Sequence, residues 1–322
     1  MSNTRPFTPA WWLPGAHAQT LWPHLLRRRP KLDLWRERLE LPDGDFLDLD
    51  WTTAPRGPIV LVLHGLEGSI RSPYAAGILR ACHGRGWRAA LMHFRGCSGE
   101  PNRLARSYHS GETSDLHHVV GLLKKREPET PFCAVGYSLG GNVLLKWLGE
   151  QGKTAPLAGA VAVSVPFDLA KAADRLERGF SRLYQWALLR QLRRSMVRKA
   201  RRVPLPIRVD GLRRLKTFRQ FDDQVTAPLH GFRDAQEYYT RSSSRRFLRH
   251  IEVPTLILHA LDDPFLSEDA IPRVSELSSA VSLDLSPHGG HVGFVTGRLP
   301  GSAGYWLETR IVDYLSGIFH CV

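Results

Sequence analysis

The sequence has little that would bind a metal ion or a nucleotide. Its four cysteines, Cys82, Cys97, Cys133 and Cys321, lack the spacing of a metal site or a disulfide framework. There is no His-x-x-x-His or Cys-x-x-Cys pattern, and no glycine fingerprint of a dinucleotide site or a P-loop. We therefore expect neither a metal nor a cofactor, and unpaired cysteines favour a reducing, cytoplasmic location.

Long hydrophobic runs are also missing. No stretch approaches the length of a transmembrane helix. Residues 1–6 are polar and lead into a Trp- and Pro-rich segment, which is not the pattern of a signal peptide. No internal repeat stands out. A chain of 322 residues suggests one large domain, over 1–322, or a domain with a sizeable insertion.

Positive charge is abundant, but it is confined to one segment. The net charge is +13, and residues 168–250 alone hold 21 Lys and Arg against 8 Asp and Glu. The rest of the chain is therefore neutral on balance. No nucleic-acid recognition motif accompanies the charge, so we expect no nucleic-acid partner.

The stretch 132–145 is the most informative part of the chain. A short apolar run leads into Gly-x-Ser-x-Gly, and a helical apolar pattern follows at once. This order predicts a strand, a sharp turn with Ser138 at its point, and a helix. Gly136 and Gly140 would let strand and helix approach closely. Ser138 is then a candidate nucleophile, while the simpler interpretation makes it a helix N-cap.

Strands and helices alternate around this motif. Unbroken apolar runs predict buried strands, and segments of helical pattern separate them, which is typical of a mainly parallel sheet with right-handed crossovers. A β-hairpin over 34–51 precedes them. The predicted strands are 58–63, 87–94, 132–137, 158–165, 254–260 and 281–285. The predicted helices are 73–82, 114–125, 266–277 and 305–315, together with the helix that begins directly after Ser138.

A serine nucleophile requires a base and an orienting acid, and both follow later strands. Asp262 and Asp263 come after the strand 254–260, and we favour Asp263 because Pro264 fixes the loop behind it. Asp262 would be its solvated or N-capping neighbour. The base is expected to be His291, with His288 as its competitor. The order Ser, Asp, His is typical of α/β-hydrolases.

Two backbone N–H groups are expected to form an oxyanion hole. The N–H of Leu139 would open the helix after the serine. The N–H of Leu66, in the loop His64-Gly65-Leu66, would be the second. We interpret His64 as a residue that supports this loop. The remaining histidines without a triad-like setting are interpreted as structural: His93, His109, His117, His118 and His259.

Two segments lie outside this scheme. Residues 1–30, rich in Trp and Pro, predict an irregular arm with buried indoles, or else a wall of the substrate entrance. Residues 168–250 predict a helical lid, where an apolar stripe from Phe180 to Met196 is surrounded by arginines. Such a helix covers the site with its arginines solvated, or lies on an anionic membrane surface.

Several motifs resemble those of a known family. They are Trp-Trp-Leu-Pro-Gly-x-His-Ala-Gln-Thr at 11–20, Leu-His-Gly-Leu-Glu-Gly at 63–68, Gly-Tyr-Ser-Leu-Gly-Gly-Asn at 136–142, Asp-Asp-Pro-Phe at 262–265 and Gly-Gly-His-Val-Gly-Phe at 289–294. The chain resembles the YheT-type branch of the α/β-hydrolase superfamily, which also includes plant EMB8-like proteins and mammalian abhydrolase-domain lipases. The resemblance implies a serine hydrolase of carboxylic esters, with Ser138, Asp263 and His291 at the triad positions.

The sequence therefore predicts a serine esterase that works through an acyl-enzyme, on small-molecule or lipid esters. Thioesterase and phospholipase activity on the same triad remain alternatives. A further alternative is a non-catalytic, membrane-associated binding protein on the same fold.

Overall fold

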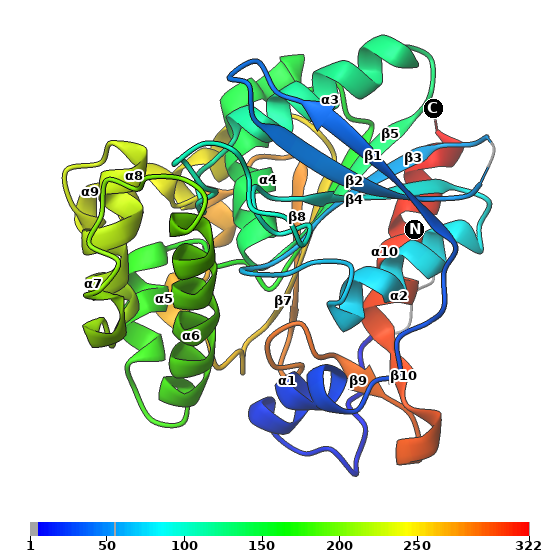
Figure 1. Cartoon of the computed structure of the whole chain (residues 1–322). Coiled ribbons are helices and arrows are strands. Elements are labelled where there is room, and N and C mark those ends of the chain that lie inside the picture. Colours follow the sequence, from blue (N-terminus) through cyan, green and yellow to red (C-terminus); the bar gives the residue numbers. More distant parts are fainter. Residues whose placement is uncertain (1–5, 55, 322) are drawn as a thin grey trace.

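One sheet of eight strands runs through the molecule (Figure 1). The computed structural model describes residues 6–54 and 56–321, so the polar residues 1–5, on which the signal-peptide expectation partly rests, lie outside the described residues. The strands lie in the order β1-β2-β4-β3-β5-β6-β7-β8. Within this sheet, as described, β1 pairs with β2 and β2 with β4 antiparallel, and the other neighbouring strands pair parallel. The strands are β1 (Leu34–Glu40), β2 (Phe46–Thr52), β3 (Ile59–Leu63), β4 (Arg88–His93), β5 (Phe132–Tyr137), β6 (Gly159–Val163), β7 (Thr255–Ala260) and β8 (Val281–Ser286).

Helices cover both faces of this sheet, which explains its unbroken apolar strands. Every residue of β3 and β5 is buried. Two separate apolar clusters form, one on each face: Leu116 and Leu144 belong to the first, and Ile78 and Ile311 to the second. The mainly parallel α/β sheet is confirmed. The covering helices are α3 (Ser114–Arg126) and α4 (Leu139–Gln151) on one face, and α2 (Pro73–His83) and α10 (Trp306–His320) on the other.

The basic segment forms a helical layer between β6 and β7, on the left of Figure 1. Its last turn, Arg245–His250, returns to the body of the molecule, because Phe247 lies directly against Gly149 of α4. The division into an arm over 1–30, a body and a lid over 168–250 stays a prediction. The helices of the layer are α5 (Leu169–Leu176), α6 (Ser181–Ala200), α7 (Phe218–Phe221), α8 (Ala227–His230) and α9 (Ala235–Ser242).

The stripe predicted on α6 is partly wrong. Tyr184, Leu192 and Met196 are buried, but Phe180 and Leu183 are each 49% exposed. Leu189, which the stripe omits, is fully buried in a small apolar cluster. The helix packs against both the cavity and its neighbours in the lid, so its buried face is wider than one stripe.

The helix expected over 266–277 is also wrong. This segment contains two short turns of 3-10 helix, Glu268–Ala270 and Val274–Glu276. Pro272 separates them, and the residue before a proline is disfavoured in the α conformation. The apolar spacing was therefore misleading here.

The N-terminal arm is more regular than expected. Ala16–Leu25 forms a helix, α1, with Pro23 inside its last part. Trp11 is 77% exposed, which contradicts the expectation of buried indoles, although Trp12 and Trp22 pack against each other. A short ribbon of β9 (Val295–Thr296) and β10 (Gly304–Tyr305) lies beside the arm in Figure 1. None of the helices in residues 6–54 and 56–321 is long and apolar enough to cross a bilayer.

Candidate active site

Ser138 stands on a strained turn between β5 and α4. Its backbone has φ 51° and ψ −117°, a conformation that non-glycine residues seldom adopt. A Cβ atom at Gly136 would lie 2.5 Å from the carbonyl oxygen of Gly140, and one at Gly140 would lie 2.5 Å from that of His64. Both glycines are therefore required by close backbone approach, as their spacing predicted.

Ser138, His291 and Asp263 lie in one hydrogen-bonded chain. The distance from Ser138 Oγ to His291 Nε2 is 3.0 Å, and that from His291 Nδ1 to Asp263 Oδ2 is 2.8 Å. Burial opposes ionisation of the Asp263 carboxyl, but the charge and hydrogen bond of His291 outweigh it, so the pKa of Asp263 is lowered. The ring of Phe265 stacks on the His291 imidazole at 3.9 Å between ring centres. The arrangement can deprotonate a serine hydroxyl.

The competing acid and base lie beside this chain. Asp262 Oδ1 accepts a hydrogen bond from the Gly290 N–H at 2.8 Å. His288 Nδ1 is 3.5 Å from Asp262 Oδ2, and the His288 side chain is 62% exposed. Asp262 therefore neither stays solvated nor caps a helix: it holds the loop that carries His291.

The two expected oxyanion donors face the same cavity as Ser138. Leu66 and Leu139 both line it. Among residues 6–54 and 56–321, neither backbone N–H donates to a protein acceptor. The Ser138 N–H, by contrast, is engaged by the Val163 carbonyl at 2.8 Å. Free N–H groups beside a nucleophile are suited to bind an oxyanion.

His64 supports the loop that carries Leu66. Its Nε2 accepts the Phe94 N–H at 3.1 Å, which places the ring proton on Nδ1. Nδ1 then donates to the Gly65 carbonyl oxygen at 2.7 Å. Burial lowers the pKa of His64 to about 3, so the ring stays neutral. These bonds agree with the interpretation of His64 as a structural residue.

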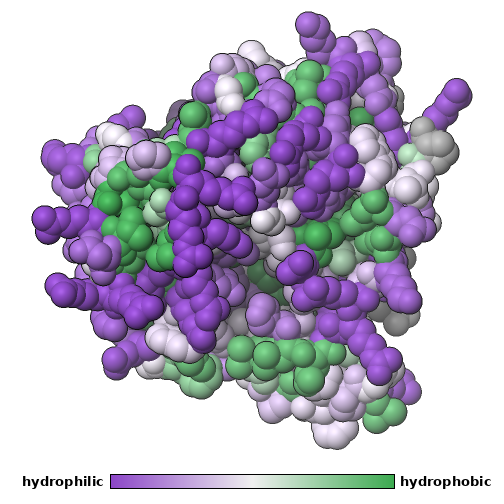
Figure 2. Space-filling model, in the orientation of Figure 1, coloured by the Kyte–Doolittle hydropathy of each residue, from purple (hydrophilic) through white to green (hydrophobic). Residues whose placement is uncertain are grey.

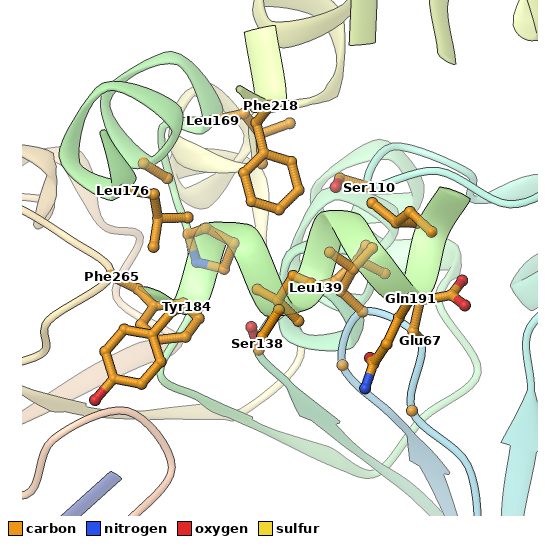
Figure 3. A pocket seen from close by; sticks show the side chains of 18 of the residues that line it. Glu67, Ser110, Ser138, Leu139, Leu169, Leu176, Tyr184, Gln191, Phe218 and Phe265 are labelled. Carbon is orange, nitrogen blue, oxygen red and sulfur yellow. The ribbon is translucent and has the colours of Figure 1, made fainter. Parts of the chain in front are cut away.

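A cavity of about 420 Å³ opens over Ser138. Its walls are mostly apolar, and the lid helices and α1 supply much of them. In Figure 3, Leu169, Leu176 and Phe218 from the lid lie around the same space as Ser138. Thr20, Leu21 and His24 of α1 also line the cavity. The arm is thus both a packed element and a wall of the cavity, the two alternatives that the sequence left open.

The residues that hold the His291 loop from outside were not among the predicted site residues. Thr20 Oγ1 accepts the His291 N–H at 2.9 Å, and Ser164 Oγ accepts the Val292 N–H at 3.0 Å. Gln19 Oε1 accepts the Val295 N–H at 2.7 Å. The motif Gly-x-His-Ala-Gln-Thr in the arm was the available signal, but the sequence gave no reason to pair it with residues near 291.

Three side chains, two of them from the cavity wall, have the composition of a metal site. His109, Glu112 and His230 offer ligand atoms within 4.8 Å of one another. The Gly111 N–H donates to His109 Nδ1 at 3.1 Å, which leaves the proton on Nε2, the atom nearer Glu112. Arg106 and Ser114 already donate to the Glu112 carboxylate. The bonding of these groups therefore does not fit a cation.

The fold defines the class of protein. A family model described as the α/β-hydrolase fold matches residues 58–298. The esterase Pf2001 of Pyrococcus furiosus has a similar fold, with a TM-score of 0.58, 15% identity and 98% of each chain covered.

Proteins of similar sequence narrow the family assignment. The chain is 46% identical to "Putative esterase YheT" of Escherichia coli, over 98% of this chain and 94% of that protein. It is 31% identical to "Phospholipase ABHD3" of Mus musculus, over 94% of this chain and 76% of that protein. The chain belongs to the α/β-hydrolase superfamily, in the YheT-type branch that its motifs predicted, and is a hydrolase-family, esterase-like protein.

Proposed function

We propose that this protein is a serine hydrolase that cleaves carboxylic esters through Ser138, His291 and Asp263. The observation that carries the proposal is the continuous hydrogen-bonded chain of these three side chains, which ends on a strained turn in the wall of a cavity. A helix N-cap has no need of a histidine on its hydroxyl or of a buried carboxylate behind that histidine. This proposal therefore explains more than the N-cap interpretation does.

The reaction follows from the positions of the protons. His291 Nδ1 donates to Asp263, so Nε2 is free to accept the Ser138 proton as Oγ attacks the acyl carbonyl. The Leu66 and Leu139 N–H groups stabilise the oxyanion that forms. His291 then protonates the leaving alcohol. Water repeats the same steps on the acyl-enzyme, with His291 as its base.

The substrate class we propose is an ester with an apolar acyl chain. The lid residues Leu169, Leu176 and Phe218 supply an apolar wall close to Ser138. A relative named as a phospholipase favours lipid esters within this class. Thioesters and phospholipids present the same acyl carbonyl to the same groups, so they belong in the substrate panel.

The test is hydrolysis of p-nitrophenyl esters from acetate to palmitate, with an acyl thioester and a phospholipid alongside. We expect Ser138→Ala to lower kcat by about 10⁴- to 10⁶-fold, the scale of triad knockouts. A fluorophosphonate probe should label the wild type and not this variant. Ser302→Ala, which removes an exposed serine far along the chain, is the matched control and should keep full activity and labelling.

Two outcomes would contradict the proposal. One is a folded Ser138→Ala protein that keeps its activity. The other is a folded wild type that hydrolyses none of the substrates and is not labelled. The second result would favour a binding protein on the same fold.

We also propose that the outer face of α6 contacts anionic lipid. Trp186 and Leu183 are 53% and 49% exposed on this helix, and Arg182, Arg190 and Arg194 are exposed beside them. Figure 2 shows hydrophilic side chains running along α6, with a hydrophobic area beside them on the left. Exposed apolar groups among arginines are typical of a helix that lies on a membrane surface.

A further inference from the structure

Glu67 is the residue of the oxyanion loop whose role the proposed reaction leaves unexplained. It follows Leu66 directly and lines the cavity, as does Gln191 of α6, and Figure 3 labels both residues. Its backbone has φ 52°, in the left-handed region. A non-glycine residue stays in that region only where its surroundings hold it. The hydrogen bonds of Glu67 identify the groups that hold its backbone in this region.

Hydrogen bonds anchor the peptide groups on both sides of Leu66. The Gly65 carbonyl oxygen accepts from His64 Nδ1 at 2.7 Å and from the Gly68 N–H at 3.0 Å. A trans peptide points its N–H away from its C=O, so this carbonyl sets the direction of the Leu66 N–H. On the other side, the Glu67 N–H donates to Tyr108 Oη at 2.7 Å.

The Glu67 carboxylate completes this second anchor. The Tyr108 hydroxyl accepts the Glu67 N–H and donates to Glu67 Oε1 at 2.9 Å. One hydroxyl is thus hydrogen-bonded to both the backbone and the side chain of Glu67. The other oxygen, Oε2, accepts from the hydroxyl of Ser195. Ser195 lies on α6, so the carboxylate joins the oxyanion loop to the lid.

We propose that Glu67 is a positioning residue for the Leu66 N–H, and that its bond to Ser195 makes the geometry of the oxyanion hole depend on the seating of α6. The inference rests on the proposed function. When α6 is seated, Ser195 and Tyr108 together fix the carboxylate, and the strained backbone holds Leu66 between two anchored peptide groups. When α6 moves away, one anchor of the carboxylate is lost.

The test compares Glu67→Gln, Ser195→Ala and Ser195→Thr with the wild type on the best ester of the panel. Deletion of an oxyanion donor costs about 10²- to 10³-fold in kcat, so loosening one should cost about 10-fold. We expect this loss in kcat for Glu67→Gln and Ser195→Ala, with KM within about twofold, because the interaction acts on the transition state. Ser195→Thr keeps the hydroxyl and should restore kcat.

A transition-state analogue separates positioning from lid packing. A trifluoromethyl ketone forms a tetrahedral adduct with Ser138 whose oxyanion occupies the hole, so its Ki should rise about as much as kcat falls. The alcohol product, which has no acyl oxygen to place in the hole, should bind unchanged. Val197→Ala shortens an exposed side chain of the same helix and is the matched control. Glu67→Gln combined with Ser195→Ala should be no worse than the more damaging single variant, because both break the same link.

The inference is overturned if the variants raise KM alone, leave the Ki of the ketone unchanged, or are not rescued by threonine. An inactive wild type would overturn the proposed function and this inference with it. An active wild type whose Glu67 and Ser195 variants match it in kcat and Ki overturns the inference alone.

Discussion

Buried neutral histidines are a recurrent feature at the residue scale. His259 of β7 has neither ring nitrogen bonded to any partner among the described residues, and it lies close enough to Asp263 to interact with its charge. Burial lowers the pKa of His259 to about 4. The same cause, burial, lowers the pKa of three others: His64 to about 3, His109 to about 4 and His230 to about 3.

These histidines should make the fold sensitive to mild acid. Between the unfolded pKa of about 6.5 and the folded pKa of about 4, only the unfolded chain takes up the proton at His259, so the free energy of unfolding falls as the pH drops through this window. Lowering the pH from 6.5 to 5 should cost about 2 kcal/mol for this one group. Between pH 6.5 and 5, the free energy of unfolding of His259→Leu should fall by about that much less than that of the wild type. Urea unfolding at pH 8, 6.5 and 5 measures the difference.

At pH 8 and above the difference in stability between the two proteins should no longer change with pH, since the His259 ring is neutral in both the folded and the unfolded state. Equal losses in the wild type and in His259→Leu on acidification would contradict the prediction. They would mean that His259 gains its proton in the folded state as readily as in the unfolded chain.

The catalytic candidates were predictable because each stands at a strand end in a fixed order. Ser138 follows β5, Asp263 follows β7, and His291 follows β8, and parallel strands bring these ends to one edge of the sheet. Asp262 and Thr20 were not predictable. Each acts by accepting a backbone N–H from the His291 loop, and no local pattern shows which distant N–H a side chain will meet.

At the scale of elements, the strands were easier to predict than the segments between them. Strands such as β3 and β5 are buried along their whole length, and this burial imposes an unbroken apolar run that is visible in the sequence. The conformations of the lid and of the arm are determined by tertiary contacts instead. Lys199 follows the stripe that was predicted on α6, and although it is charged it is only 3% exposed.

Lys199 anchors the end of α6 to the body of the protein. Its ammonium group donates to Asn102 Oδ1 at 2.8 Å and to the Arg106 carbonyl oxygen. Burial lowers the pKa of Lys199 to about 8. The buried ammonium group replaces its contacts with water by hydrogen bonds to two acceptors in the body. These bonds fix α6 near Ser195, the residue that binds Glu67.

Replacing this lysine should loosen the lid helix locally. Lys199→Met keeps the length of the side chain but leaves Asn102 and a backbone carbonyl without their donor, at a cost of about 1 to 3 kcal/mol. We expect faster amide hydrogen exchange over the second half of α6, while α4 exchanges as before. Arg201→Met, an exposed position just after the helix, is the matched control. Unchanged exchange in α6 would show that Lys199 is not an anchor.

At the scale of the whole molecule, charge and the cavity are placed together. The excess of 13 positive charges lies in residues 168–250. The same segment supplies Leu169, Leu176, Tyr184 and Phe218 to the cavity walls. α1 supplies another part of the wall, and at its end Leu25 and Leu26 are 69% and 61% exposed. A lipid surface that met this side would be in contact with the elements that enclose the candidate site.

The charge of the lid predicts how such contact depends on lipid and salt. Each arginine near an anionic surface contributes about 1 kcal/mol, and salt screens the attraction over a Debye length of about 10 Å at 0.1 M. We expect the protein to sediment with phosphatidylcholine vesicles that contain phosphatidylglycerol and much less with phosphatidylcholine alone, and added salt should release it.

Arg190→Glu with Arg194→Glu should weaken binding strongly. Lys125→Glu with Lys153→Glu changes the net charge equally outside the lid and should weaken it little. If both pairs weaken binding equally, net charge rather than the α6 face is responsible; if anionic vesicles bind no protein at low salt, the arginines of α6 serve only to keep that face in water.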